Sequence, residues 1–361
     1  MNLLKLQQDT KEPILQISQN ELHMASKDIV IQGKQVRIGY RNRKQETVVH
    51  KDLNFSLYRG ELTCLLGSNG SGKSTLLRTL SAIQPVLDGS IQLLGQPLSS
   101  YSEHARSRTI GVVLTEKTQA GGLSVYELVS LGRQPHTGFF GRLNAHDKAV
   151  IDYALQAVGI YPLRNKYIAE LSDGERQKTF IAKALVQECP LILLDEPTAF
   201  LDVISRIEIM TLLRRLAKDE NRAILLSTHD IDQALLLADR LWLLTRQKGL
   251  TCGVTEDLIL SHEMESLFPQ DNIYFNPMHG GYSPRTSFHR SICLEADNEI
   301  LLHWTRNALN RIGYYCIEGE EANKNHSQLR LHAKSSQELI LIQNDQAHTC
   351  VNFEQLLSEL A

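Results

Sequence analysis

The sequence predicts an α/β fold built on a parallel sheet with helices on both faces. Three observations support it. First, four short runs are apolar on both faces, as buried parallel strands are. Second, a glycine-rich turn separates the first run from a segment with helical apolar spacing at 73–83. Third, polar side chains follow the last two runs directly, where such strands end. The runs lie near residues 61–66, 109–114, 190–195 and 223–228.

The turn after the first run is a complete G-x-x-x-x-G-K-[ST] motif. Glycines there let backbone N–H groups wrap a phosphate, and the following helix N-terminus adds partial positive charge. We expect Lys73 to reach the β- and γ-phosphates of a nucleotide and the Ser74 hydroxyl to bind magnesium. The alternative is a chance glycine-rich turn. The predicted ATP-binding residues of this segment are Gly67, Ser68, Asn69, Gly70, Ser71, Gly72, Lys73, Ser74 and Thr75.

The run at 191–194 ends in two carboxylates and a proline. Asp195 stands where a magnesium shell needs an acidic group. Glu196 follows it and can polarise a water for attack on the γ-phosphate. Acids are also common at solvated strand ends, so this pair alone leaves a structural interpretation open.

Residues 171–178 read LSDGERQK. Physically this is a capping box, with Ser172 followed three residues later by Glu175. The segment lies between the other two motifs and resembles the LSGGQ signature of ABC ATPases, with acidic residues in two of its positions, Asp173 and Glu175. Ser172 retains the hydroxyl of the signature serine, and Gly174 retains a glycine without a side chain. The resemblance implies that both contact the γ-phosphate of ATP held by a second subunit.

Shorter segments extend the resemblance. Asp202 matches the aspartate of the family's D-loop, which follows the catalytic glutamate. His229 follows the fourth apolar run and matches the switch histidine that contacts the γ-phosphate. Tyr40 matches the aromatic residue that stacks on adenine. A histidine or tyrosine at a strand end also has an ordinary packing role, which stays open here.

One position departs from the family pattern. The Q-loop glutamine is expected after the run at 109–114, but Thr115 stands there, followed by Glu116, and Gln119 lies four residues late. A threonine hydroxyl is shorter, so we expect Thr115 to reach magnesium only through a water. This loop normally links ATP to the membrane partner.

The segment after this loop indicates which kind of ABC ATPase the chain resembles. Residues 132–136 read Gly-Arg-Gln-Pro-His. They resemble the Gly-Arg-x-Pro-His segment of importer ATPases for iron-siderophore, haem and cobalamin uptake. The alternative is structural, a helix closed by Gly132 and stopped by Pro135.

Composition agrees with these motifs. The net charge of −3 gives no indication of nucleic-acid binding, and the hydrophobic fraction of 42% is that of a globular protein. No apolar run approaches the ~20 residues of a membrane helix, and the N-terminus does not resemble a secretory signal. The six cysteines are scattered, without a CxxC pair or a Cys/His cluster, so we expect a reduced cytoplasmic protein without zinc.

The 361 residues divide into three predicted zones. Residues 1–27 form a polar leader. Residues 28–254 hold every nucleotide motif, and the resemblance implies a P-loop NTPase of the ABC ATPase type, with an inserted helical subdomain near 96–180. Residues 255–361 form a small α+β extension without a recognised motif.

The sequence therefore predicts the ATP-hydrolysing subunit of an ABC importer, with ATP and Mg²⁺ as cofactors. The resemblance implies a homodimer, peripheral on the cytoplasmic side of the inner membrane. It also implies separate permease subunits and an external substrate-binding protein. The cargo would be a ferric siderophore, haem or a cobalamin. The alternatives are a DNA-repair or ribosome-associated ABC ATPase, an importer ATPase for another substrate class, and a regulatory module without turnover.

Overall fold

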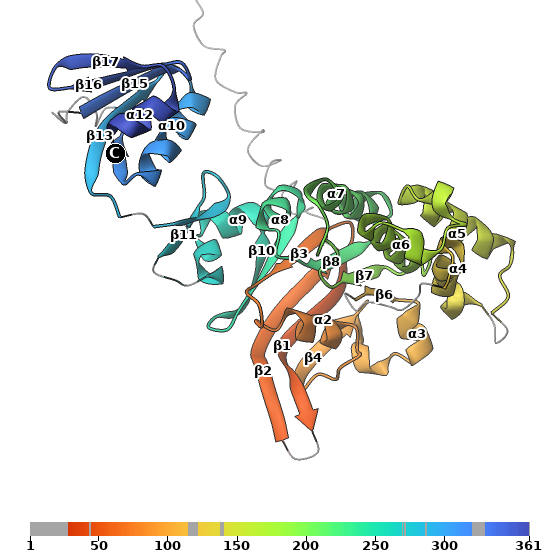
Figure 1. Ribbon diagram of the computed structural model, residues 1–361. Helices are drawn as coiled ribbons and strands as arrows, with labels where there is room; N and C mark the ends of the chain where they lie inside the picture. The colour runs from red at the N-terminus through yellow and green to blue at the C-terminus, as the bar shows by residue number, and fades with distance from the viewer. Residues whose placement is uncertain are drawn as a thin grey trace, which may run out of the picture. The chain divides into compact units, whose positions relative to one another are not determined.

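The computed structural model describes residues 28–42, 45–114, 122–137, 141–268, 270, 272–285, 287–319 and 329–360. The chain divides into two compact units (Figure 1). The first comprises Met1–Pro269 with Phe275–Gly281, and the second comprises Gln270–Tyr274 with Tyr282–Ala361. Each unit has a sheet and a hydrophobic core of its own.

A six-stranded sheet forms the centre of the first unit, in the order β10-β9-β3-β8-β7-β6. Its neighbouring strands are parallel except for β10, which is antiparallel to β9. β3, β7 and β8 are buried along their whole length, which explains their uniformly apolar sequences. The four predicted parallel strands are confirmed. The strands are β3 (Leu62–Leu66), β6 (Ile110–Val113), β7 (Leu191–Leu194), β8 (Ala223–Ser227), β9 (Arg240–Thr245) and β10 (Gly249–Val254).

A second, antiparallel sheet has the order β2-β1-β4-β5. Buried residues of β1, β2 and β4 share one core with α2 and the parallel strands. Within it, the rings of Phe55 and Trp242 lie 5.1 Å apart, and Trp242 is fully buried. This core holds the end of β3 against helix α2, where the glycine-rich turn lies. The strands are β1 (Ile29–Asn42), β2 (Gln45–Tyr58), β4 (Asp88–Leu93) and β5 (Gln96–Pro97).

Helices α7 and α8 pack on β3, and α7 also packs on β8, while α6 packs on β6. Several helices begin where a polar side chain caps the free N–H groups, as at Ser124, Asn144 and Ser172. The helical segments of the first unit are α2 (Lys73–Leu80), η2 (Leu98–Ser100), α3 (Glu103–Ser107), α4 (Val125–Ser130), η3 (Leu131–His136), α5 (Ala145–Ala157), η4 (Tyr161–Leu163), η5 (Ile168–Glu170), α6 (Asp173–Leu185), α7 (Val203–Asp219), α8 (Ile231–Leu237), α9 (Thr255–Leu260) and η6 (Glu263–Leu267).

Helices α4, α5 and α6 pack on one another and form the helical part of the first unit, beside the β6 edge of the sheet (Figure 1). The expected helical range of 96–180 also contains β6, which belongs to the parallel sheet. The segment after β6 therefore returns to the sheet only at β7, once the helical part is complete.

The second unit is an α+β domain, as the sequence predicts. Its five-stranded sheet has the order β14-β13-β15-β16-β17, and α10 connects the parallel strands β13 and β14. On α10 the buried residues are Thr305, Ala308 and Leu309, whereas Trp304 is 62% exposed although its spacing suits the same face. The elements are β13 (Arg290–Ala296), α10 (Glu299–Arg311), β14 (Tyr314–Ile317), β15 (Leu329–Ser335), β16 (Glu338–Gln343), β17 (Gln346–Cys350) and α12 (Phe353–Leu360).

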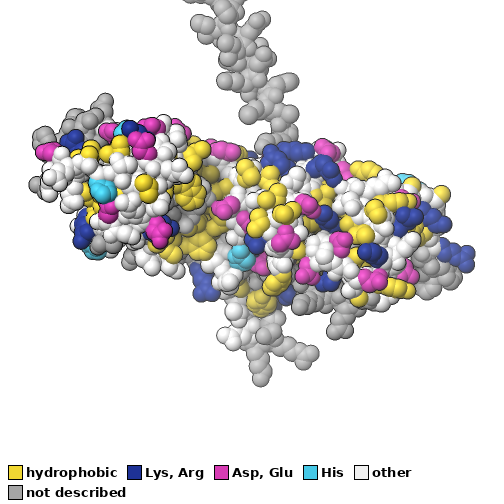
Figure 2. Space-filling model, turned by 45° about the horizontal axis from the view of Figure 1, so that its top comes forward, with side chains coloured by type: hydrophobic (Ala, Val, Ile, Leu, Met, Phe, Trp, Pro, Cys, Tyr) yellow, Lys and Arg dark blue, Asp and Glu magenta, His cyan; other side chains and the backbone are white. Residues whose placement is uncertain are grey.

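Within the C-terminal extension expected from the sequence, β11 (Ile273–Asn276) pairs with β12 (Gly281–Pro284) in a short hairpin. On the face shown in Figure 2, basic, acidic and hydrophobic side chains are interspersed, and neither sign of charge dominates. In the described part of the chain, no helix is both long and apolar enough to cross a bilayer.

Candidate functional site

The glycine-rich turn lies between β3 and α2, as predicted. Gly70 and Gly72 have φ values of 71° and 102°, in the left-handed region that side chains disfavour. A Cβ atom on Gly67 would lie 2.5 Å from the Leu244 carbonyl oxygen. The turn therefore needs glycine at 70 and 72 because of the backbone conformation, and at 67 because the Leu244 carbonyl oxygen lies so close.

Lys73 begins α2 and bends back over the turn. Its Nζ donates to the carbonyl oxygens of Gly67, at 2.7 Å, and Ser68, at 3.2 Å. Burial lowers the pKa of Lys73, while the carboxylates of Glu196 and Asp195 act in the opposite direction. The ammonium group is thus preorganised beside the turn and can exchange its two carbonyl contacts for phosphate oxygens.

The carboxyl ends of β3, β7 and β8 meet at this edge of the sheet. Ser74 Oγ lies 3.4 Å from Asp195 Oδ1, and Ser227 Oγ donates to the same oxygen at 2.7 Å. A hydroxyl and a carboxylate that converge beside a phosphate loop are the oxygen ligands that Mg²⁺ prefers. The predicted pair Ser74 and Asp195 is therefore suited to hold the ion.

Glu196 and His229 come together across the ends of β7 and β8. His229 Nε2 lies 2.7 Å from Glu196 Oε1, and the Glu196 backbone N–H donates to Ser227 Oγ at 2.9 Å. Glu196 has a φ of 47°, which is uncommon for a residue with a side chain and frequent at functional sites. A cavity of about 220 Å³ opens at this pair, and Thr198, Phe200 and other residues line it.

Tyr40 lies on β1, and its hydroxyl is 2.9 Å from Thr75 Oγ1 on α2. The side chain is 45% exposed, so a ring face is free to take a planar ligand beside the phosphate loop. Stacking on adenine stays a prediction. Within the loop, Ser71 is buried, and its carbonyl oxygen lies 2.6 Å from His50 Nε2 of β2.

Ser172 caps α6 in a capping box. Its Oγ accepts from the Glu175 N–H at 3.3 Å, and the Glu175 carboxylate accepts from the Ser172 N–H at 2.9 Å. Backbone and hydroxyl donation from Ser172 lowers the pKa of Glu175, against the opposing effect of partial burial. The capping box thus fixes the first turn of α6, which contains Gly174.

Asp202 caps the next helix, α7. Its carboxylate accepts from the Ser205 N–H at 3.0 Å and the Ser205 hydroxyl at 2.8 Å, and these bonds lower its pKa. Ser205 also lies against Gly174, because a Cβ atom there would be 3.1 Å from Ser205 Oγ. The predicted signature and D-loop residues therefore form one surface, built on the N-termini of α6 and α7. Thr115, Glu116 and Gln119 lie outside the described residues.

Sequence reasoning assigned no role to Ser227 and His50, which the structure connects to the site. It also gave no individual role to Arg133, which the structure places in an ion-pair cluster. Ser227 is fully buried, yet it ends a run that is otherwise apolar. A hydroxyl at that position, two residues before His229, was the available signal. His50 carries no comparable signal in the sequence.

Arg133 belongs to the Gly132–His136 segment. Helix α4 ends just before this segment, at Ser130, and the segment itself lies in the 3₁₀ helix η3, which contains Pro135. The Arg133 side chain is 2% exposed and pairs with the carboxylate of Asp147, at 2.8 Å, and that of Glu188, at 2.5 Å. A Cβ atom on Gly132 would lie 2.2 Å from the Lys183 carbonyl oxygen, so the segment packs directly on α6.

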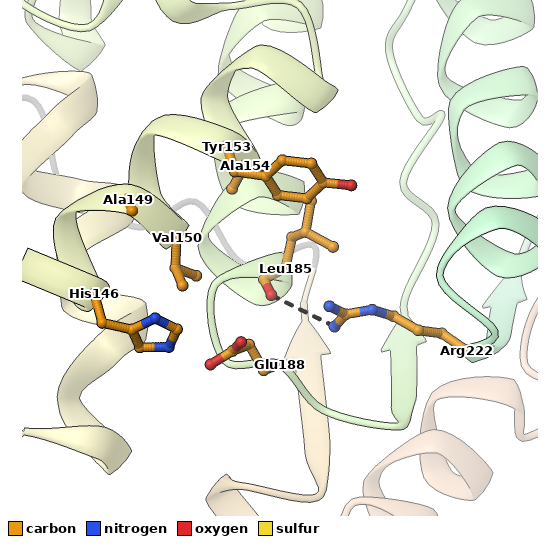
Figure 3. A pocket seen from close by; sticks show the side chains of 8 residues that line it. All are labelled: His146, Ala149, Val150, Tyr153, Ala154, Leu185, Glu188 and Arg222. Carbon is orange, nitrogen blue, oxygen red and sulfur yellow. Dashed lines mark hydrogen bonds between the residues drawn. The ribbon is translucent and has the colours of Figure 1, made fainter.

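A cavity of about 230 Å³ lies beside this ion-pair cluster (Figure 3). Tyr153 and other residues of α5 line one side, and Glu188 and Arg222 approach from the segments that follow α6 and α7. Arg222 donates to the Leu185 carbonyl oxygen at 3.4 Å. The cluster therefore joins the helical part to the end of the parallel sheet, away from the phosphate loop.

We expect Ser227→Ala to lower ATP hydrolysis by about 10- to 100-fold, because a hydrogen bond to a charged group is worth about 1.5–3 kcal/mol. The change removes the hydroxyl that orients both Asp195 and the Glu196 backbone. The Mg²⁺ concentration for half-maximal activity should also rise. Ser81→Ala, which removes a hydroxyl from the end of α2, is the control. Unaltered Mg²⁺ dependence would contradict the orienting role.

Comparison with known proteins shows the family of the chain. The model of the ABC transporter family matches residues 50–199, and that of the iron ABC transporter C-terminal domain matches residues 289–361. An uncharacterized ABC transporter ATP-binding protein of Methanocaldococcus jannaschii is 36% identical over 70% of this chain and 85% of its own length.

Two further matches are of the same kind. The iron(3+)-hydroxamate import ATP-binding protein FhuC of Bacillus subtilis is 35% identical over 73% of this chain and 94% of its own length. Among solved structures, an inward-facing ABC transporter assigned to the metal-chelate type has 31% identity and a TM-score of 0.58. That match covers 67% of this chain and 89% of the other. The chain belongs to the family of ABC transporter ATP-binding proteins.

Proposed function

We propose that this protein is the ATP-hydrolysing subunit of an importer for iron chelates. One observation carries the catalytic part: Asp195, Glu196, Ser227 and His229 form a continuous hydrogen-bonded chain beside the phosphate loop. Such a chain orients a base and its neighbours before the substrate arrives, which is what positioned catalysis requires.

In the proposed mechanism, the N–H groups of residues 67–75 and the Lys73 ammonium bind the phosphates of ATP. Ser74 and Asp195 would hold Mg²⁺, which neutralises phosphate charge. Glu196 takes the proton of the attacking water, and the hydrogen bond from His229 sets the orientation of its carboxylate. In this proposal His229 would exchange that bond for a contact with the γ-phosphate once ATP binds.

The site is completed by a second copy of the chain in this proposal. Ser172, Gly174 and Asp202 lie at two helix N-termini, which are suited to meet a phosphate from outside the subunit. Beside them, Phe200, Val203 and Ile204 are 89%, 65% and 71% exposed. Exposed apolar residues gathered around a polar surface support an interface at this face.

We further propose that the homodimer lies on the cytoplasmic side of the inner membrane, bound to separate permease subunits. An external substrate-binding protein would deliver the cargo. The helical part formed by α4–α6 would transmit conformational changes of the ATPase site to the permease, because the ion pairs of Arg133 join it to the sheet. The names of the relatives and the iron-transporter domain at 289–361 favour a ferric siderophore over haem or a cobalamin.

The cargo is tested by growth of a deletion strain on a ferric siderophore, haem or a cobalamin as the sole source of iron or cobalamin. We expect the wild-type gene, but not Lys73→Ala, to restore growth on the ferric siderophore, because the variant loses the ammonium that holds the phosphates. Normal growth of the uncomplemented strain on all three would contradict the cargo class. If Lys73→Ala restored growth as well as the wild-type gene does, ATP hydrolysis at this site would not be the energy source of the uptake.

A further inference from the structure

Three side chains with metal-binding atoms converge in the second unit. His348 Nε2 lies 3.1 Å from Glu359 Oε1, and Cys350 Sγ lies 3.5 Å from Glu359 Oε2. One ligand atom from each residue lies within 4.8 Å of those of the other two. None of these residues belongs to the ATPase site.

The fold explains the convergence. His348 and Cys350 are two residues apart on β17, so both side chains point to the same face of the sheet. Their partners on β16 are Leu341 and Leu339, which are buried in the core of this unit. Helix α12 packs on β16 and β17 and carries Glu359 to the same place.

The contacts of Glu359 with His348, at 3.1 Å, and with Cys350, at 3.5 Å, are close to the ligand spacing around a small metal ion. Bond lengths of about 2.0–2.3 Å at tetrahedral angles separate neighbouring ligand atoms by about 3.3–3.6 Å. Imidazole, thiolate and carboxylate together are characteristic of first-row transition metals rather than of Mg²⁺ or Ca²⁺. We propose that His348, Cys350 and Glu359 bind a divalent first-row transition metal ion such as Zn²⁺ or Fe²⁺, with an open fourth position.

The charges of the three side chains suit a divalent ion. Binding replaces the S–H bond with a metal–sulfur bond and releases the proton to solvent. One thiolate and one carboxylate then balance the two charges of the ion, and the site becomes neutral. Gln355 Nε2 donates to Glu359 Oε1 at 3.0 Å and thereby holds the carboxylate in place.

The sequence predicts no zinc site, because its cysteines form no CxxC pair. Only two of the three ligands are near each other in sequence, as the His-Thr-Cys of β17. The third comes from a helix that the chain reaches after a turn.

The test is Co²⁺ titration of the full-length protein in excess Mg²⁺ and without nucleotide. We expect about one equivalent to bind with the visible spectrum of a four-coordinate ion and a thiolate charge-transfer band. Cys350→Ser should abolish the charge-transfer band. His348→Gln should weaken binding by about 10-fold or more. Since His348 is exposed, that variant keeps its fold.

Matched controls are Cys316→Ser and His332→Gln, which alter a half-buried cysteine and an exposed histidine elsewhere in the same unit. Both should bind Co²⁺ as the wild type does. Zn²⁺ should raise the Tm of the wild type and of both controls but not that of His348→Gln. Absence of bound Co²⁺, or an unchanged charge-transfer band in Cys350→Ser, would overturn the proposal.

Discussion

Replacement of Glu196 by glutamine is expected to lower steady-state ATP hydrolysis by about 10²–10⁴, the usual contribution of a positioned base. Glutamine keeps the size and the hydrogen-bonding ability of the side chain, so His229 and Ser227 retain their contacts. It cannot accept the proton of the attacking water. Nucleotide affinity should stay near that of the wild type, and ATP should hold the protein as a closed dimer.

Hydrolysis and oligomeric state measured on the same preparation check this prediction. Glu263→Gln is a suitable control, since it changes a half-buried carboxylate that pairs with Lys248 away from the site. Undiminished hydrolysis in Glu196→Gln would falsify the assignment of the base. A loss of ATP affinity instead of turnover would assign Glu196 to binding.

Replacement of Arg133 by methionine is expected to destabilise the helical part of the first unit by about 3–5 kcal/mol. This is the cost of removing one partner of a buried ion pair and leaving the other charge buried. The change leaves Asp147, which is 2% exposed, without its guanidinium partner. It also frees the Val186 carbonyl oxygen that Arg133 Nη1 contacts at 2.7 Å. Amide hydrogen exchange in α5 and α6 measures this local opening directly.

Arg59→Met provides the comparison, because the pair of Arg59 with Asp28 is largely exposed and is worth about 0–1 kcal/mol. The effect of Arg133→Met should also depend on pH. Burial by itself raises the pKa of Asp147, but the hydrogen bonds from the Asn144 backbone and from Arg133 hold it below its usual range. This stabilisation is present above the ordinary aspartate pKa and is lost as the pH falls through the lowered value. Equal exchange rates in the two arginine variants at neutral pH would contradict the prediction.

Much of the fold follows from contiguous residues. The apolar runs predicted β3, β6, β7 and β8, because a strand buried on both faces needs apolar side chains at every position. The glycine pattern predicted the turn before α2, where the backbone adopts positive φ at Gly70 and Gly72. Spacing was less informative on α10, where Trp304 has the spacing of the buried face and is exposed.

The sequence by itself determined the phosphate loop, the Asp195–Glu196 pair and the cap at Ser172, because each depends on a few neighbouring residues and their local backbone geometry. Only the tertiary structure decided which distant groups meet. It placed the Ser227 hydroxyl between Asp195 and the backbone of Glu196, and paired Arg133 with acids from two other segments. It also brought Glu359 to the two ligands on β17. These contacts depend on the order of strands in each sheet and on which helix covers them, and neither is encoded in the spacing of nearby residues.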